Sequence, residues 1–360
     1  MKKLLFILTL IIIILASCAN REQNSNVLLE GLTVPKENHP TLSSLFTENL
    51  TITPLETTDE SLIGRIDKIV KFKGDYYICS SNGRHIHHFN SDGKFISSLK
   101  RQGAGPEEYH RIEDFDVYEV NGKTEVWISD NQSLKIYDVS DFSFKYKIPY
   151  TFMIHKFKRI DESRILLVTG NSEHILTLSD EKGNVISEYL EKEMPFIMFR
   201  PHQFISFDSS YLFQLGVANA FVEYNPVINT FQEGVFSKEK EFITDKELLD
   251  LFEANGIDYL GKIRDGIYIS NMVMNNETLW ISINKNRKRY ISRYFNGEMV
   301  STEITSNSIL TSFLMGVSDE SLLLYATPDQ IIKCEEVLLD KYKDKITYNS
   351  EDNPYILEFF

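Results

Sequence analysis

The sequence has few cysteines, and none of them is paired at a spacing typical of metal ligands. Three cysteines occur in 360 residues, and no CxxC motif is present. This excludes a small fold built on a disulfide framework and a zinc ribbon. We expect Cys79 and Cys334 to be buried thiols in strands, with a disulfide between them as the alternative.

Sequence motifs of several enzyme and ion-binding classes are also missing. There is no GxSxG nucleophile elbow, no Asp-x-Asp-x-Asp-Gly calcium loop and no repeated Asp box of the sialidase type. Paired carboxylates such as Asp114 and Asp116 occur, but they discriminate little in an acidic chain. The sequence therefore predicts no particular catalytic residues and no cofactor.

Long apolar runs are absent except at the N-terminus. Met1-Lys2-Lys3 precedes an apolar run from Leu4 to Leu15, which ends at Ala16-Ser17-Cys18. The run is short of the roughly 20 residues that span a bilayer. This pattern is typical of a bacterial lipoprotein signal peptide, with a membrane anchor or an ordinary secretory signal as alternatives. We expect cleavage after residue 17, a diacylglycerol on the Cys18 thiol and an acyl chain such as palmitate on its amine.

Positive charge is in deficit. The formal net charge is −14, and removal of the two lysines of the signal peptide takes it to −16. An acidic surface disfavours nucleic acid and anionic lipid headgroups as partners. It is compatible with neutral glycans, cations or basic peptides and selects none of them. The expected partners are a membrane, through the N-terminal lipid, and a glycan, a peptide or an envelope protein.

Aromatic residues are plentiful, and short β-rich segments recur along the chain. The 24 Phe and 18 Tyr favour strands. Six similar segments start 50, 39, 47, 67 and 43 residues apart. Such a period, with about four strands per unit, indicates an all-β fold, a six-bladed β-propeller. The segments are Tyr76–Cys79, Val126–Ile128, Ile165–Val168, Leu212–Leu215, Leu279–Ile281 and Leu322–Tyr325.

Turn residues and one helix signal complete the predicted domain. Asp, Asn and Gly follow most of these segments where outer hairpins would turn. The 67-residue gap contains a capping box at Thr244 and Glu247, which predicts one inserted helix over about 245–255. Strands 50–53 and 355–360 are expected to close the ring. The predicted organisation is a signal peptide at 1–17, a lipidated N-terminus and flexible tether at 18–44, and the propeller at 45–360.

Several segments outside the repeated runs match those of a known family. They are Leu55–Thr58, Ile63–Ile69, Phe89–Ile96, Gln102–Tyr109 and Asn353–Leu357. On these segments the chain resembles the NHL-like six-bladed β-propeller lipoproteins of Gram-negative gut bacteria, most densely over residues 50–140. The resemblance implies the fold and the lipid anchor, and it implies no settled activity.

The sharpest local motif is Gly103-Ala104-Gly105-Pro106-Glu107-Glu108-Tyr109. Its glycines permit positive φ and Pro106 then fixes the chain, whereas no GK[ST] follows as in a phosphate loop. One interpretation is a polar ligand-binding lip at the channel; the other is a blade-linking turn. The candidate ligand-binding residues are Arg101, Gly103, Gly105, Glu107, Tyr109, His110, Arg200 and His202.

Two functional hypotheses follow. The first is an envelope binding module whose ligand or protein partner sits at the channel face. The second is a hydrolase or lyase at the channel, which requires three titratable or metal-binding side chains from different blades to converge. A metal site at His85 and His87, which share a strand face, is a lesser alternative. An outer-membrane location facing the periplasm is favoured over the cell surface, because no acidic cluster follows Cys18.

Overall fold

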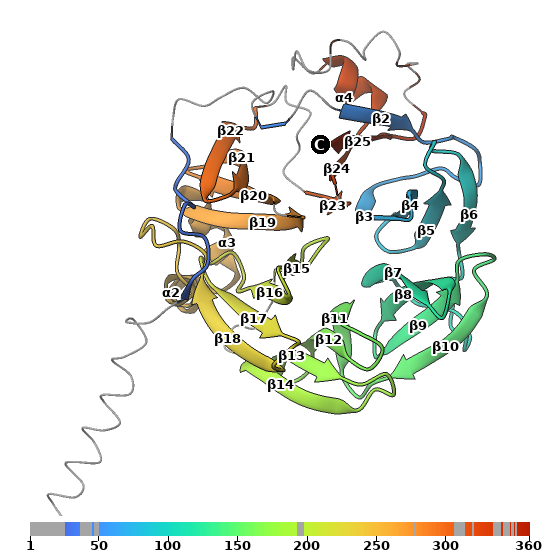
Figure 1. Cartoon of the computed structure of the whole chain (residues 1–360), viewed down its shortest axis with the longest axis horizontal. Coiled ribbons are helices and arrows are strands. Elements are labelled where there is room, and N and C mark those ends of the chain that lie inside the picture. Colours follow the sequence, from blue (N-terminus) through green and yellow to red (C-terminus); the bar gives the residue numbers. More distant parts are fainter. Residues whose placement is uncertain are drawn as a thin grey trace, which may run out of the picture.

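The computed structural model describes residues 26–36, 45–46, 50–192, 198–276, 278–305, 314–318, 320–333, 340, 346, 349 and 351–360. The described residues form six sheets, arranged in a ring around one axis (Figure 1). Each sheet is one blade, and strands from both termini complete the last. This confirms the predicted all-β, six-bladed β-propeller. No helix among the described residues is long and apolar enough to cross a membrane.

Four blades consist of four consecutive antiparallel strands. Blade 1 contains β3 (Ile66–Phe72), β4 (Asp75–Ser80), β5 (His85–Phe89) and β6 (Phe95–Leu99). Blade 2 contains β7 (Asp114–Val120), β8 (Lys123–Asp130), β9 (Ser133–Asp138) and β10 (Phe144–Pro149). Blade 3 contains β11 (Met153–Arg159), β12 (Ile165–Gly170), β13 (His174–Ser179) and β14 (Val185–Glu191). Blade 5 contains β19 (Ile267–Asn275), β20 (Thr278–Lys285), β21 (Lys288–Phe295) and β22 (Glu298–Glu303).

The other two blades recruit a strand from the N-terminal region. Blade 4 contains β15 (Phe204–Phe207), β16 (Ser210–Gln214), β17 (Phe221–Asn225) and β18 (Thr230–Val235), and β1 (Asn26–Val27) pairs in parallel with β18. Blade 6 contains β23 (Gly316–Val317), β24 (Leu322–Ala326) and β25 (Tyr355–Phe359), and β2 (Leu50–Pro54) pairs with β25.

The six repeated apolar segments all fall on the second strand of a blade. That strand is buried on both faces between neighbouring blades, as in β12, where every residue is buried. A strand of this kind reads as a continuous apolar run instead of an alternating pattern, which is why the repeat is visible in the sequence. Cys79 lies on β4 and is a buried free thiol, as expected, whereas Cys334 lies outside the described residues.

The ring closes as predicted. Leu50 pairs with Phe359 and Pro54 with Tyr355, so β2 and the C-terminal strand β25 share blade 6. The side chain of Asn353 strengthens this junction, because its Oδ1 accepts from the Ile63 N–H at 2.8 Å. Its Nδ2 donates to the carbonyl oxygens of Glu56 and Ser61 at 2.8 and 2.9 Å.

The predicted helix is present as α2 (Asp245–Asn255). Thr244 and Glu247 form the expected capping box, and Gly256 ends the helix with a φ of 55°. Short helical turns follow, at η2 (Gly256–Asp258), α3 (Tyr259–Lys262) and η3 (Ile263–Asp265), and α4 (Pro328–Lys333) follows β24. These extra elements are too short to produce a helical period in the sequence, so they were not predicted.

Part of the expected tether is docked. Leu29 and Leu32 are each 1% exposed and pack with the core between blades 4 and 5. The Ser237 hydroxyl donates to the Leu32 carbonyl at 2.6 Å, and Lys285 Nζ donates to the Pro35 carbonyl at 2.7 Å. Residues 26–36 therefore differ from the free tether that their polar surroundings suggested. The domain boundaries stay a prediction, and residues 1–25 lie outside the described residues.

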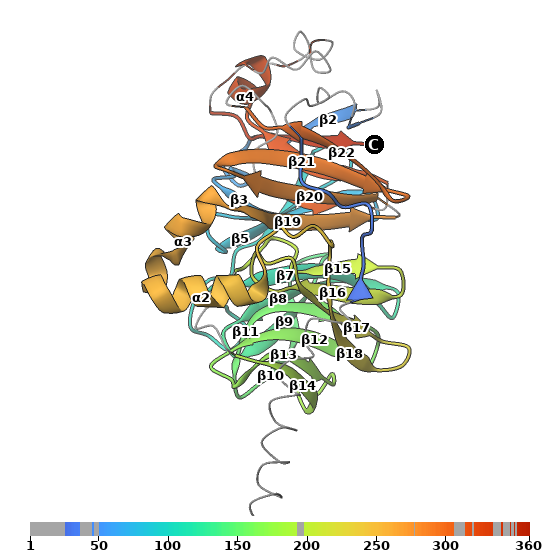
Figure 2. The same ribbon diagram turned by 90° about the vertical axis from the view of Figure 1, so that its left-hand side faces the viewer.

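The two faces of the ring differ in their connections. Strand direction alternates within a blade. The fourth, outermost strand of one blade therefore ends on the face of the ring where the first, innermost strand of the next blade begins. We call this the crossover face; it carries residues 100–113, and it carries residues 236–266 with α2 and α3, which project from one side of the ring (Figure 2). The opposite, hairpin face carries the turns between third and fourth strands, such as 90–94 and 226–229.

Candidate functional site

The innermost strands bring charged side chains from three blades together. Lys68 on β3 places its Nζ 2.9 Å from Oδ1 of Asp114 on β7, and Lys156 on β11 places its Nζ 3.5 Å from the same oxygen. The side chains of Lys68, Asp114 and Lys156 are 9%, 3% and 10% exposed. Three titratable groups from three neighbouring blades therefore converge at the inner edge of the ring.

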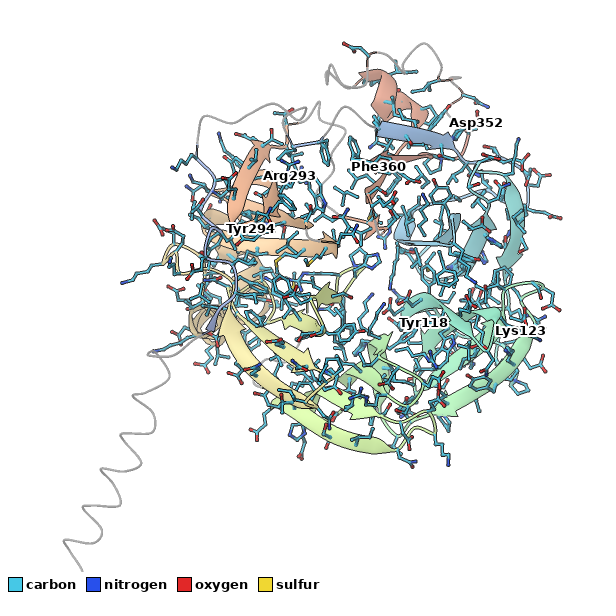
Figure 3. The ribbon with its side chains drawn as sticks, viewed as in Figure 1. Tyr118, Lys123, Arg293, Tyr294, Asp352 and Phe360 are labelled. Atoms are coloured by element: carbon cyan, nitrogen blue, oxygen red, sulfur yellow. The ribbon has the colours of Figure 1, made fainter. Side chains whose placement is uncertain are left out.

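A second ion pair extends this cluster. Lys158 Nζ lies 2.9 Å from Oδ2 of Asp116, and the Tyr118 hydroxyl donates to that oxygen at 2.9 Å. Tyr118 lies near the middle of the ring, whereas Lys123 at the start of β8 lies farther out (Figure 3). Burial alone would raise the pKa of Asp116, but the ammonium groups of Lys158 and Lys68 outweigh it and hold that pKa well below its usual range.

We call Lys68, Asp114, Asp116, Lys156 and Lys158 the channel cluster, and its charges do not balance. It holds three ammonium groups and two carboxylates. Lys68 and Lys156 share one oxygen of Asp114, while the other oxygen accepts the N–H of Phe157 at 3.3 Å. Burial lowers the pKa of Lys156 despite this carboxylate. The cluster is therefore a locally cationic site in an acidic protein.

β-Bulges determine the direction of two of these lysine side chains, Lys68 and Lys156. The pairing register shifts between Ile66 and Lys68 in β3 and between Ile154 and Lys156 in β11. A bulge inserts one extra residue and redirects the next side chain, here toward the axis. A third bulge in β19 ends at Asn271. An Ile-x-Lys triplet occurs at both lysine positions, at 66–68 and 154–156, and this repeat is the sequence signal that could have identified them.

His202, one of the predicted site residues, lies beside the inner strands. Its Nε2 is 3.2 Å from the Ile69 carbonyl oxygen and 3.0 Å from that of Met315. Because both neighbours are acceptors, Nε2 carries the proton in the neutral ring and Nδ1 is left as an acceptor. Burial, reinforced by the Lys68 ammonium, lowers the pKa of His202 to about 3. The ring is therefore neutral at physiological pH.

Arg200, the other predicted residue of this segment, is a buried cation. Its guanidinium donates to the carbonyl oxygen of Ser270 at 2.9 Å and to that of Gly216. Among the described residues no carboxylate lies within ion-pair distance of it. Burial lowers the pKa of Arg200 to about 10. The adjacent Phe199 is 49% exposed, and its ring lies 4.6 Å from that of His155.

The predicted Gly103 motif forms a compact connection between blades 1 and 2. Tyr109 is fully buried, and its hydroxyl donates to the carbonyl oxygens of Arg84 and Leu99 at 2.7 and 3.0 Å. The Gly105 N–H donates to Glu108 Oε2 at 2.8 Å. A Cβ added at Gly103 would lie 1.9 Å from that same oxygen, so a larger residue would displace the Glu108 side chain from this contact. Neither Gly103 nor Gly105 has a positive φ, so the conformational freedom expected of these glycines is not used.

The polar residues of this loop remain near the surface. Arg101 and Glu107 form an exposed ion pair at 3.6 Å. His110 has a side chain that is 71% exposed, and its backbone N–H donates to Asp130 at 3.1 Å. The loop thus contacts blades 1 and 2, whereas Arg200 contacts β19 and His202 contacts β3 and the residue before β23. The structure distributes the predicted ligand-binding residues over these two regions.

His85 and His87 lie on the third strand of blade 1. His87 Nδ1 is 3.1 Å from the Ser98 hydroxyl, and burial lowers the pKa of His87 to about 3. The ring centroids of His85 and His87 are 6.1 Å apart. In the part of the chain that the structure describes, no group of three His, Cys, Asp or Glu residues is arranged to hold a metal ion.

Comparisons with solved structures agree with the fold. A Bacteroides fragilis protein assigned as exported superposes with a TM-score of 0.76 at 17% identity, over 90% of this chain and 97% of that one. A member of the DUF4221 family from Bacteroides vulgatus gives a TM-score of 0.54 at 10% identity, over 87% and 96% of the two chains. These likenesses support the propeller; the lipoprotein and NHL-like parts of the resemblance stay predictions.

Sequence comparison places the chain in a family without an assigned activity. No curated protein matches it. The family model described as "Domain of unknown function (DUF4934)" matches residues 32–359, which is nearly the whole chain and includes the docked residues before β2. The protein therefore belongs to the DUF4934 family.

Proposed function

We propose that this protein is a lipid-anchored binding module of the cell envelope and that its channel takes an anionic ligand. The observation that carries the proposal is the channel cluster, in which three ammonium groups face two carboxylates; Lys68 and Lys156 are buried and Lys158 is partly exposed. A buried excess charge is costly unless it is neutralised, and a bound carboxylate or phosphate would supply the missing negative charge. The ligand class is therefore defined by its charge.

Two residues of the segment that precedes β15, Phe199 and Arg200, would suit the rest of such a ligand. Arg200 is a second buried cation, and a guanidinium binds carboxylates and phosphates in a bidentate geometry. The exposed ring of Phe199 offers a flat apolar surface next to it. An acidic sugar or an acidic peptide combines these features. Its charge is opposite to that of the basic peptides with which the net charge of the chain is compatible, because the site is locally cationic.

The proposed location is the periplasmic side of the outer membrane. The signal-like N-terminus with Cys18 supports export and lipidation, and the superposed Bacteroides fragilis protein is itself assigned as exported. Two or more acyl chains hold a protein stably on a bilayer. Palmitate labelling of the expressed chain, abolished in Cys18→Ser, tests this part of the proposal.

An enzyme remains the second candidate, and one observation favours it. Titratable side chains from three blades do converge, and a buried lysine with a lowered pKa, such as Lys156, can serve as a general base or a nucleophile. We rank a hydrolase or lyase second because each charged group in the cluster is held in an ion pair with another. An activity lost in Lys156→Met but not in a surface lysine variant would reverse this order.

The deciding experiment is a binding survey on protein that begins near Asn24. Thermal shift and calorimetry with phosphate, dicarboxylates and uronic-acid oligosaccharides should show stabilisation, and neutral oligosaccharides should show none. Lys156→Met should abolish the response, whereas the exposed control Lys182→Met should retain it. Stabilisation by a neutral glycan alone, or by a metal that a chelator reverses, would contradict the proposed ligand class.

A further inference from the structure

The outer hairpin of blade 4 ends in two exposed aliphatic side chains. Val227 and Ile228, between β17 and β18, are 77% and 63% exposed. The equivalent turns of blades 1 and 3 read Asn-Ser-Asp-Gly-Lys at 90–94 and Asp-Glu-Lys-Gly-Asn at 180–184. Of these three turns, only that of blade 4 has exposed aliphatic side chains at its tip, while Ile96, Val185 and Ile186 follow the turns of blades 1 and 3 and are 53%, 47% and 48% exposed. Exposed apolar groups of this kind mark interaction sites.

The turn is held in one conformation. The backbone N–H groups of Val227 and Ile228 both donate to Asn225 Oδ1, at 2.9 and 3.3 Å. Arg164 Nη1 donates to the Pro226 carbonyl oxygen at 2.8 Å and fastens the turn to blade 3. The two aliphatic side chains are thus presented by an ordered backbone.

The N-terminal end of β1 points toward the same face. β1 runs parallel to β18, with Asn26 opposite Gly234 and Val27 opposite Val235. The start of β1 is therefore directed toward the side of the 226–229 turn. At about 3.3 Å per residue, Gly234 lies about 13 Å from the start of β18. The eight residues from Cys18 to Asn26 span at most about 28 Å, which is enough to reach the turn.

The crossover face is the poorer candidate for membrane contact near the arm. The insertion at residues 245–265 also exposes aliphatic groups, with Ile257 at 75% and Leu260 at 37%. That segment contains six acidic and three basic residues, whereas residues 224–230 contain no charge. Anionic headgroups repel an acidic segment and tolerate a neutral apolar turn.

We propose that the Val227–Ile228 turn is a second membrane contact, which inserts into the bilayer interface beside the lipid on Cys18. This inference rests on the lipid anchor of the proposed function. The two contacts together set an orientation, in which the hairpin face of blade 4 meets the bilayer and the crossover face points away from it. Lys68 and Asp114, near the crossover ends of β3 and β7, then lie closer to the aqueous side than to the bilayer.

A pair of matched tryptophan variants of the full, lipidated chain tests this orientation. Ile228→Trp and Ile257→Trp each replace one exposed isoleucine, on opposite faces, and the native Trp127 and Trp280 are 1% and 3% exposed. Each variant is reconstituted in phosphatidylcholine vesicles with and without brominated acyl chains. Ile228→Trp should show a blue-shifted emission and a loss of intensity with brominated lipid, and Ile257→Trp should show neither.

The other outcomes separate the two proposals. Mass spectrometry of the N-terminal peptide from the same sample reports acylation of Cys18. An acylated chain in which residue 228 is not quenched, or is quenched no more than residue 257, overturns the second contact and leaves the anchor intact. A chain without acyl groups that does not sediment with vesicles removes the anchor and the orientation together.

Discussion

The two halves of the ring line the channel with different chemistry. Blades 1 to 3 contribute Lys68, Asp114 and Lys156, which meet as a charged cluster. The segments of blades 4 and 5 contribute the neutral side chains of His202 and Asn271 and the cation Arg200, and all three donate to main-chain carbonyl oxygens. A ring of similar blades can therefore place its ion pairs on one side of the axis, and an anionic ligand would be drawn to the lysines of that side.

Removal of the carboxylate that Lys68 and Lys156 share should have the largest effect on stability. Asp114→Asn leaves Lys68 and Lys156 buried without their common counter-ion. Breaking a buried pair in this way typically costs about 3–5 kcal/mol, because an uncompensated charge stays behind. Urea unfolding should show this loss of free energy of unfolding. A loss below about 1 kcal/mol would mean that water or relaxation solvates the lysines and that the charged half is not dry.

Much of the fold was predictable from the sequence, because its signals are local. The second strand of each blade is buried on both faces and reads as an apolar run, as at Ile165–Val168. The capping box of α2 lies within four residues, Thr244 to Glu247. Both patterns can be recognised in the sequence without knowing which residues lie beside them in space.

The channel cluster was not predicted, because the residues that form it are far apart in the chain. Asp114 lies 46 residues from Lys68 and 42 from Lys156, and charged residues on a short inner strand look the same as solvent-exposed ones. The docking of Leu29 and Leu32 was missed for a similar reason, since a few apolar residues in a polar segment indicate burial only when a partner surface is known.

A change of pH tests the neutral half. The pKa of His202 is about 3 in the folded protein and about 6.5 in the unfolded chain. The unfolded chain binds the proton first, so this stability is complete above pH 6.5 and is lost as the pH falls toward 3. At pH 5 the loss is about 2 kcal/mol. His202→Gln, which keeps a side-chain N–H donor, should lose correspondingly less stability between pH 7 and 5.

His87 provides the internal reference for that measurement. Burial lowers its pKa to about 3 as well, so the wild-type protein should lose stability from both rings as the pH falls. The difference between wild type and His202→Gln isolates the ring near the channel. Identical pH profiles for the two proteins would show that His202 is solvated, and the contrast between the halves would then rest on Asn271 alone.

The smallest effect on stability is expected for a substitution of Asn271. Asn271 occupies the position after the third bulge, where blades 1 and 3 have lysines. Its Nδ2 donates to the Leu314 carbonyl at 3.2 Å, while its Oδ1 is buried without a hydrogen-bond partner among the described residues. Asn271→Leu loses one hydrogen bond and removes one unsatisfied acceptor, so stability should change by less than about 1 kcal/mol. Asn271→Lys would instead add a further buried ammonium group without a new carboxylate, and it should destabilise the protein clearly more than the leucine variant in the same urea titration. Equal effects of the two substitutions would show that the neutral half tolerates charge as readily as the charged half, and the one-sided channel would lose its physical basis.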